Sequence, residues 1–289
     1  MTIRTIPVEL PRAHSAEIYR TVDDIDLPIH LFKPQDVTGP TPAVVFYFGG
    51  GWTGGSIQQF YMQACYLAQR GVTCGLVEYR IKNKHNVTPF ACVEDARSAM
   101  RYIKLHADRL GIDSQRICAS GGSAGGHLAA NTATAKNCDA PDDDLAIDPT
   151  PAAMFLFNPV LDTVASSWAK HTHNESVSGL LKDFGDRGSD VSPMHNVESG
   201  LPPTMIVHGE DDVTVPYQQV IAFTQLMLEA GNDCQLIGYP QQGHGFFNYR
   251  EGNNTEIFTD TLTRLDDFLV SLGWLAPGQF VESFDASLS

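Results

Sequence analysis

The chain has 289 residues and carries 19 basic and 34 acidic side chains, which gives a formal net charge of -15. This strong negative charge argues against nucleic acid and against an anionic membrane surface as partners. The length accommodates one large domain with a sizeable hydrophobic core, and no change in composition along the chain indicates a second one.

Residues 1–11 have no apolar stretch of the kind found in secretory signals, and no run anywhere is long enough to span a bilayer. We therefore expect a soluble, cytoplasmic protein.

The N-terminal part of the sequence predicts a hairpin followed by a buried strand. Residues 16–22 and 26–32 alternate apolar and polar side chains, which predicts two antiparallel strands with one face in water. Residues 43–48 are continuously apolar, which is typical of a strand buried on both faces.

Helical and apolar segments alternate along the rest of the chain. This alternation predicts an α/β fold with a mostly parallel central sheet and helices on both faces, and ligands should bind at the carboxyl ends of its strands. Residues 162–201 break the alternation and exceed an ordinary connection in length, so we expect a short lid insertion over the site within a single domain. We expect helices over 57–70, 91–110, 217–230 and 256–272, and strands over 72–79, 152–159, 204–208 and 234–239.

The cysteines and a run of aspartates could form disulfides or bind a cation, but the sequence predicts neither role. The six cysteines are scattered through apolar patterns, which favours buried free thiols over disulfides. The run Asp142-Asp143-Asp144 lacks the alternating ligand spacing of a calcium loop, so we expect a solvated loop there.

The most informative stretch follows the apolar run at residues 117–119. Gly121-Gly122-Ser123-Ala124-Gly125 matches the pattern G-x-S-x-G, in which glycines allow a turn so tight that the serine hydroxyl is exposed. The positive end of the following helix favours negative charge at that hydroxyl. A phosphate-binding loop and a plain tight turn are the alternatives. A phosphate-binding loop is disfavoured because no lysine follows the glycines. Ser123 is therefore the candidate nucleophile.

A serine nucleophile needs a base to take its proton and a carboxylate to orient that base. In a strand-turn-helix arrangement of this kind the chain order is serine, acid, histidine. Residues 210–212 supply acids directly after a buried strand, and the glycine-flanked His244 follows the last strand. A solvated acidic turn is the alternative for the first segment. We expect His127, inside the helix after Ser123, and His208, at a strand end, to be structural.

The oxyanion of an acyl-transfer reaction needs preorganised hydrogen-bond donors, each worth about 3 kcal/mol. Phe48-Gly49-Gly50-Gly51-Trp52 lies at the end of a buried strand, where bare backbone can approach a ligand. A flexible glycine turn is the alternative. We expect backbone amides of this loop to donate to the oxyanion, and the amide of Ala124 to donate from the opposite side.

With these segments in place, the chain resembles the α/β-hydrolase superfamily from about residue 16 to residue 275. It is most similar to esterases of the hormone-sensitive-lipase type and to their capless relatives, which include acetyl and feruloyl esterases acting on plant carbohydrate. The motifs that carry the resemblance are Gly50-Gly51-Trp52, Gly122-Ser123-Ala124-Gly125-Gly126-His127, His208-Gly209, Asp212-Val213-Thr214-Val215-Pro216 and Gly243-His244-Gly245-Phe246.

The resemblance assigns a role to each matching residue and implies neither a metal nor an organic cofactor. The D-x-x-V-P spacing typical of the family selects the last acid of residues 210–212. The implied roles are Ser123 as nucleophile, Asp212 as orienting acid, His244 as base, and the amides of Gly50, Gly51 and Ala124 as the oxyanion hole.

The chain departs from the family pattern in two places. Phe48 stands where the pattern H-G-G-G has histidine, which affects the support of the loop. We also expect no N-terminal helical cap like that of lipase-type members, because only a predicted hairpin and a connector precede Phe48. An uncapped site favours polar, bulky alcohols over long acyl chains. We thus expect a serine carboxylester hydrolase that acts through an acyl-enzyme on short-chain acyl or feruloyl esters, small or oligosaccharide, including those of plant carbohydrates. A peptidase or arylformamidase of the same fold and a non-catalytic binding protein are the alternatives.

Overall fold

The computed structural model describes residues 14–35, 37–168, 179–250 and 255–278. The first eleven residues, in which no signal is predicted, and residues 169–178 of the predicted lid lie outside the described residues. Within the described ranges, no helix has the length and apolar character needed to cross a membrane.

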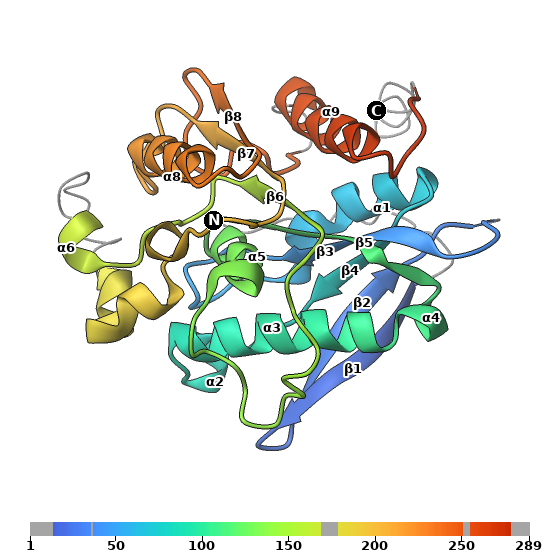
Figure 1. Cartoon of the computed structure of the whole chain (residues 1–289), viewed down its shortest axis with the longest axis horizontal. Coiled ribbons are helices and arrows are strands. Elements are labelled where there is room, and N and C mark those ends of the chain that lie inside the picture. The colour runs from blue at the N-terminus through green and yellow to red at the C-terminus, as the bar shows by residue number, and fades with distance from the viewer. Residues whose placement is uncertain (1–13, 36, 169–178, 251–254, 279–289) are drawn as a thin grey trace.

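Eight strands form one sheet in the order β1-β2-β4-β3-β5-β6-β7-β8 (Figure 1). The β1–β2 and β2–β4 pairs are antiparallel, and all later neighbours pair in parallel. The mostly parallel sheet predicted from the alternation is therefore confirmed. The strands are β1 (His14–Val22), β2 (Ile25–Phe32), β3 (Thr41–Tyr47), β4 (Thr73–Val77), β5 (Ile112–Gly122), β6 (Ala153–Phe157), β7 (Thr204–Gly209) and β8 (Cys234–Tyr239).

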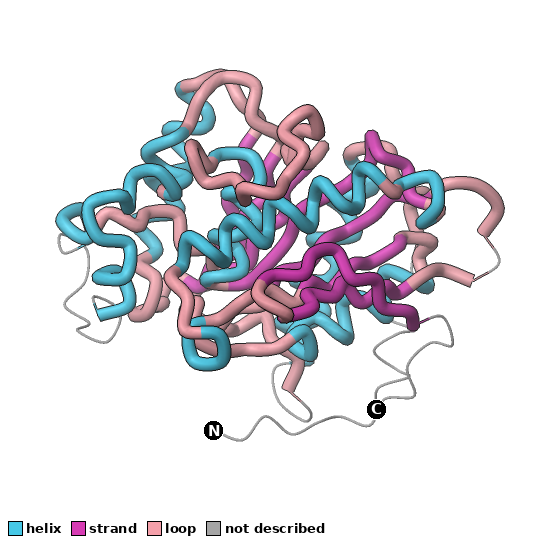
Figure 2. The backbone as a smooth tube through the Cα atoms, turned by 90° about the horizontal axis from the view of Figure 1, so that it is seen from below, coloured by secondary structure: helices cyan, strands magenta, loops and turns pink. Residues whose placement is uncertain are grey.

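Helices cover both faces of this sheet (Figures 1 and 2). Helices α3, α5 and α8 contribute to the core on one face, and α1 and α9 contribute to the core on the other. The expected helix over 91–110 is two helices, α3 and α4, because the backbone leaves the helical conformation at His106. The helices are η1 (Ile57–Phe60), α1 (Tyr61–Gln69), α2 (Lys82–His85), α3 (Pro89–Leu105), α4 (Ala107–Leu110), α5 (Ala124–Thr134), α8 (Tyr217–Glu229) and α9 (Thr255–Ser271).

The central strands are buried on both faces, as their continuous apolar runs predict. In β3, Ala43, Val45 and Tyr47 belong to the core beneath α3 and α5, whereas Val44 and Phe46 belong to the core beneath α1 and α9. All six cysteines are buried and free, which confirms their interpretation as structural thiols.

The predicted lid region contains short helical turns. Its described parts include α6 (Ala165–Trp168), η2 (Lys182–Val191) and η3 (Pro193–Asn196). A hydrogen bond joins the described parts on either side of residues 169–178, because the hydroxyl of Thr163 donates to the carbonyl of Gly188 at 2.7 Å.

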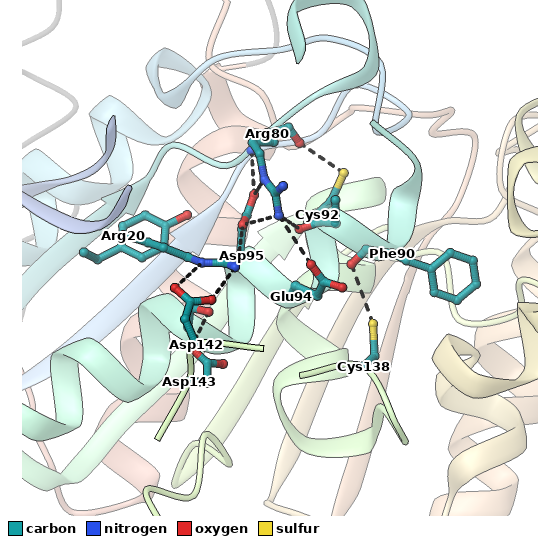
Figure 3. Close-up of polar contacts among 12 residues, drawn as sticks. Arg20, Arg80, Phe90, Cys92, Glu94, Asp95, Cys138, Asp142 and Asp143 are labelled. Carbon is teal, nitrogen blue, oxygen red and sulfur yellow. Dashed lines mark hydrogen bonds and ion pairs between the residues drawn. The ribbon is translucent and has the colours of Figure 1, made fainter. Parts of the chain in front are cut away.

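A buried ionic cluster joins distant segments beside α3 (Figure 3). The carboxylate of Asp95 is fully buried and accepts hydrogen bonds from Arg20 at 2.9 Å and from Arg80 at 2.8 and 2.9 Å. Arg20 also binds Asp142 at 2.6 Å. Two guanidinium groups thereby compensate the buried charge of Asp95, and the cluster ties β1 and the segment after β4 to α3.

The prediction of a solvated loop at the aspartate run is wrong for Asp143. Asp144 is exposed, but the Asp143 side chain is only 8% exposed and accepts hydrogen bonds from Arg101 and Ser98, both at 2.7 Å. Arg101 and Ser98 lie on α3, more than forty residues earlier in the chain. Local sequence therefore gave no sign of the cations opposite this loop.

We predict that Asp95→Asn lowers the free energy of unfolding by about 3 kcal/mol, because the substitution leaves two buried guanidinium groups without a full counter-charge. Denaturant unfolding measures this loss. Asp113→Asn is the matched control, since it removes a carboxylate from the half-buried Asp113–Arg116 pair and should change stability by less than about 1 kcal/mol. Equal small losses in the two variants would contradict a structural role for the buried cluster.

Candidate active site

The turn between β5 and α5 presents Ser123 in a strained conformation. Its φ of 56° and ψ of -118° lie in a region that residues with a Cβ rarely adopt. Gly121 and Gly125 are required here because a side chain at either position would collide with the carbonyl oxygen of Tyr47 on β3. The strand, turn and helix predicted around Ser123 are therefore present, and Ser123 lies at the carboxyl end of β5.

The structure brings together the three residues predicted as nucleophile, acid and base. The Oγ of Ser123 lies 2.9 Å from Nε2 of His244, and Nδ1 of His244 lies 2.7 Å from Oδ2 of Asp212. Asp212 follows β7 and His244 follows β8, so all three project from the carboxyl ends of parallel strands. A proton can pass from Ser123 to His244 while the carboxylate holds the ring in place.

The surroundings of Asp212 keep its side chain ionised. Its Oδ1 accepts the amides of Thr214 and Val215 at 2.8 and 2.9 Å, and Nε2 of His208 lies 3.2 Å from Oδ2. Burial disfavours the charged form, but hydrogen bonds from His208 and His244 outweigh it and hold the pKa of Asp212 well below its usual range. The acceptor for Nδ1–H of His244 is therefore a carboxylate.

His208 and His127 are structural, as predicted. Nε2 of His208 lies 2.9 Å from the carbonyl of Val215. His127 is fully buried, accepts from Nε1 of Trp52 at 3.3 Å through Nδ1, and donates from Nε2 to the carbonyl of Val191 at 2.7 Å. Burial lowers the pKa of His127 to about 4, so the ring is neutral and supports Trp52 on the glycine loop.

The glycine loop after β3 presents backbone amides to the site. Within the described ranges, the amides of Gly50 and Gly51 donate to no other protein atom. The amide of Ala124, as the first residue of α5, has no acceptor within its helix. All three residues line one cavity with Ser123 and His244. The residues predicted for the oxyanion hole are thus collected around the serine.

Phe48, the departure from the family pattern, supports the loop through an aromatic contact. Its ring stacks on Tyr79 with a centroid distance of 4.2 Å, and the Tyr79 hydroxyl donates to the Phe48 carbonyl at 2.6 Å. Both side chains are buried. Aromatic packing and one hydrogen bond therefore hold the start of the loop where the family pattern has a histidine.

The cavity has a volume of about 480 Å³ and is lined largely by glycine backbone and apolar side chains. Leu180 and Leu181, from the predicted lid, contribute to its wall together with Val160 and Phe247. Trp52 also lines it, whereas Phe246 is buried in the core. Across the described part of the chain, no group of three or more His, Cys, Asp or Glu side chains is placed to hold a metal ion.

Sequence reasoning missed three amide side chains around the site. Asn158, Gln59 and Asn248 all line the cavity. Oδ1 of Asn158 accepts the amide of Gly245 at 3.0 Å, which holds the loop beside His244. One signal was available for Asn158, because it is a polar residue directly after the apolar strand β6, at the carboxyl end where ligands bind.

Comparisons with known proteins agree with this geometry. The BD-FAE family model matches residues 29–227. Among solved structures, esterase 2 of Thermogutta terrifontis is 40% identical with a TM-score of 0.85, and the match covers 95% of this chain and 100% of that chain. Structures of that enzyme include a propionate-bound form, a butyrate-bound form and a form phosphonylated by sarin.

Two curated relatives are longer than this chain. Esterase LipC of Mycobacterium tuberculosis is 26% identical over an alignment of 260 residues, and the match covers 84% of this chain and 64% of LipC. An acetylxylan esterase of Xylanibacter ruminicola is 26% identical over an alignment of 231 residues, and the match covers 78% of this chain and 44% of that protein. The chain thus spans less than two thirds of either relative.

We predict that the neutral, buried ring of His127 makes the folded protein less stable in acid. Unfolding takes up a proton at this ring wherever the pH lies between about 4 and the ordinary value of 6.5. The free energy of unfolding should fall as the pH is lowered through this window, by about 3 kcal/mol from this group alone. Denaturant unfolding at about pH 7 and about pH 4 measures the fall.

His127→Gln supplies the comparison, because a glutamine amide can replace both hydrogen bonds of the ring without taking up a proton. The variant should lose this part of the pH dependence. If the free energy of unfolding of the variant fell with pH as steeply as that of the parent protein, His127 would not be the group that causes the loss of stability in acid.

Proposed function

The chain belongs to the BD-FAE family of α/β-hydrolase esterases, and we propose that it is a serine carboxylester hydrolase that acts through an acyl-enzyme on short-chain esters. One observation carries the proposal: the hydrogen-bonded path from Asp212 through His244 to Ser123 ends in a cavity lined by available backbone amides. Ester hydrolysis by this route needs a nucleophile, a base and oxyanion donors in one place.

In the first half of the reaction, Ser123 Oγ attacks the acyl carbonyl carbon while His244 Nε2 takes the hydroxyl proton. The carbonyl electrons move onto the oxygen, where the amides of Gly50, Gly51 and Ala124 donate to the oxyanion. Collapse of this intermediate breaks the bond to the alcohol oxygen, and His244 returns its proton to the leaving alcohol. Asp212, which stays ionised, stabilises the charged ring between these transfers.

In the second half, a water molecule attacks the carbonyl carbon of the acyl-enzyme and gives a proton to His244. The same three amides hold the second oxyanion. Its collapse breaks the bond to Ser123 Oγ, which recovers the proton from His244, and the free acid leaves. The site returns to its starting state without a metal or an organic cofactor.

The walls of the cavity favour a short acyl group. Leu180 and Leu181 close one side beside the loop residue Gly51, and a side chain at Gly51 would come within 2.9 Å of Leu180 Cδ1. The propionate and butyrate forms of the Thermogutta esterase support short acids, and the Xylanibacter relative supports acetyl groups on carbohydrate. Feruloyl esters and plant carbohydrate esters stay predictions from the sequence.

The two alternatives differ from this proposal in measurable ways. An amide-cleaving hydrolase uses the same nucleophile and base, so relative rates on ester and amide substrates decide between them. A binding protein without turnover does not need the assembled path from Asp212 to Ser123, and the short distances along that path therefore disfavour it.

We predict that Ser123→Ala lowers kcat for p-nitrophenyl acetate by about 10⁴-fold or more, because no other group replaces the nucleophile. The variant should keep the unfolding midpoint of the parent and lose labelling by a fluorophosphonate. Ser199→Ala, at an exposed serine, should leave kcat unchanged. Substantial turnover by the Ser123 variant would refute the assignment.

A panel of substrates tests the acyl preference. We expect kcat/KM for p-nitrophenyl decanoate to fall about ten-fold or more below that for the acetate and butyrate esters, because the leucine wall obstructs a long chain. Methyl ferulate and an acetylated xylo-oligosaccharide test the finer predictions. Faster turnover of the decanoate would contradict the short-acyl proposal, and preference for an aryl formamide would favour the amide-cleaving alternative.

A further inference from the structure

Two side chains outside the proposed triad join the glycine loop to the loop that carries His244. Gln59 Oε1 accepts the amide of Gly49 at 2.6 Å, and Gln59 Nε2 donates to Asn248 Oδ1 at 2.9 Å. Asn248 Nδ2 then donates to the carbonyl of Gly245 at 2.9 Å. Three consecutive hydrogen bonds therefore connect segments 189 residues apart in sequence.

The two ends of this path determine the orientation of both side-chain amides. The backbone N–H of Gly49 can only donate, and the carbonyl of Gly245 can only accept. Gln59 must accept on one side and donate on the other, and Asn248 must do the same. A primary amide meets this requirement, whereas a carboxylate lacks the donor and a hydrocarbon lacks both groups.

The path begins and ends beside the reacting groups. Gly49 lies against the turn of Ser123, since a Cβ at Gly49 would come within 2.8 Å of the Gly122 carbonyl and 3.3 Å of Ser123 Cβ. Gln59 accepts the Gly49 amide, whereas the amides of Gly50 and Gly51, the next two of the loop, have no acceptor among the described residues. At the other end, Gly245 directly follows His244.

We propose that Gln59 and Asn248 are positioning residues that hold the oxyanion amides and His244 at a fixed separation on either side of Ser123. The proposal rests on the function proposed above, because that reaction needs the amides and the base to converge on one acyl group. A misplacement of about 1 Å in such a site can lower the rate by about 10²-fold.

A direct role in substrate binding is the competing explanation, since both side chains also line the cavity. The two roles affect different kinetic constants. Loss of a substrate contact raises KM and leaves kcat unchanged. Loss of positioning slows both acylation and deacylation, because both steps use the amides and His244, and KM then changes little.

The experiment compares Gln59→Met, Asn248→Leu and the double variant with Gln58→Met as the matched control. Methionine and leucine keep approximate side-chain volume but lack amide groups. Gln58 is an exposed glutamine next to Gln59 in the same turn. Kinetics with p-nitrophenyl acetate and thermal unfolding are measured for each protein.

We expect Gln59→Met and Asn248→Leu each to lower kcat by about 10- to 100-fold with KM within about two-fold of the parent. The double variant should lose little more than either single one, because each change interrupts the same path. Gln58→Met should match the parent. If one variant does not fold, the other still interrupts the path at its opposite end.

A rise in KM without a fall in kcat would overturn the positioning role, as would fully additive losses in the double variant or a kcat unchanged in both single variants. Failure of the proposed function has a separate signature, because either the parent protein would then hydrolyse no ester or Ser123→Ala would retain turnover. Loss of turnover in Ser123→Ala together with an unaffected Gln59→Met would refute only the inference about the amide path.

Discussion

The backbone of Ser123 is held in a left-handed conformation that costs on the order of 1–3 kcal/mol for a residue with a side chain. Three main-chain hydrogen bonds keep it there: its amide donates to the Phe157 carbonyl at 3.0 Å, and its carbonyl accepts from His127 and Val160 at 3.0 and 3.2 Å. The partners lie in the strand, helix and loop next to the turn. The conformation directs the hydroxyl away from the sheet and toward His244.

The same turn requires β3 to approach without intervening side chains. Gly125 lies against the carbonyls of Tyr47 and Phe48, so a larger residue would displace the strand and the glycine loop that follows it. The segment after β4 supports that loop from outside, because the amide of Lys82 donates to the Trp52 carbonyl at 3.0 Å. Arg80, within this segment, is held by the buried carboxylate of Asp95. The buried charges are therefore connected to the proposed oxyanion site.

Several features could be predicted because their signals are local or ordered along the chain. Apolar runs alternating with helical segments predict a parallel sheet, and the chain order of serine, acid and histidine places three functional groups at the same edge. The choice of Asp212 among three neighbouring acids was different, because it depended on a family resemblance rather than on the local pattern. In the structure, His244 forms its hydrogen bond with Asp212 among these three acids, and two backbone amides donate to the other carboxylate oxygen of Asp212.

The sequence by itself determined the α/β architecture, the candidate nucleophile with its base, and the glycine loop, because periodicity and glycine spacing directly reflect backbone geometry. Only the tertiary structure decided which isolated polar residues meet. Gln59 and Asn248 have no distinguishing neighbours in sequence, and Asp143 gives no sign of its partner Arg101. Such contacts join segments tens to hundreds of residues apart, so their geometry arises when the sheet brings the strand ends together.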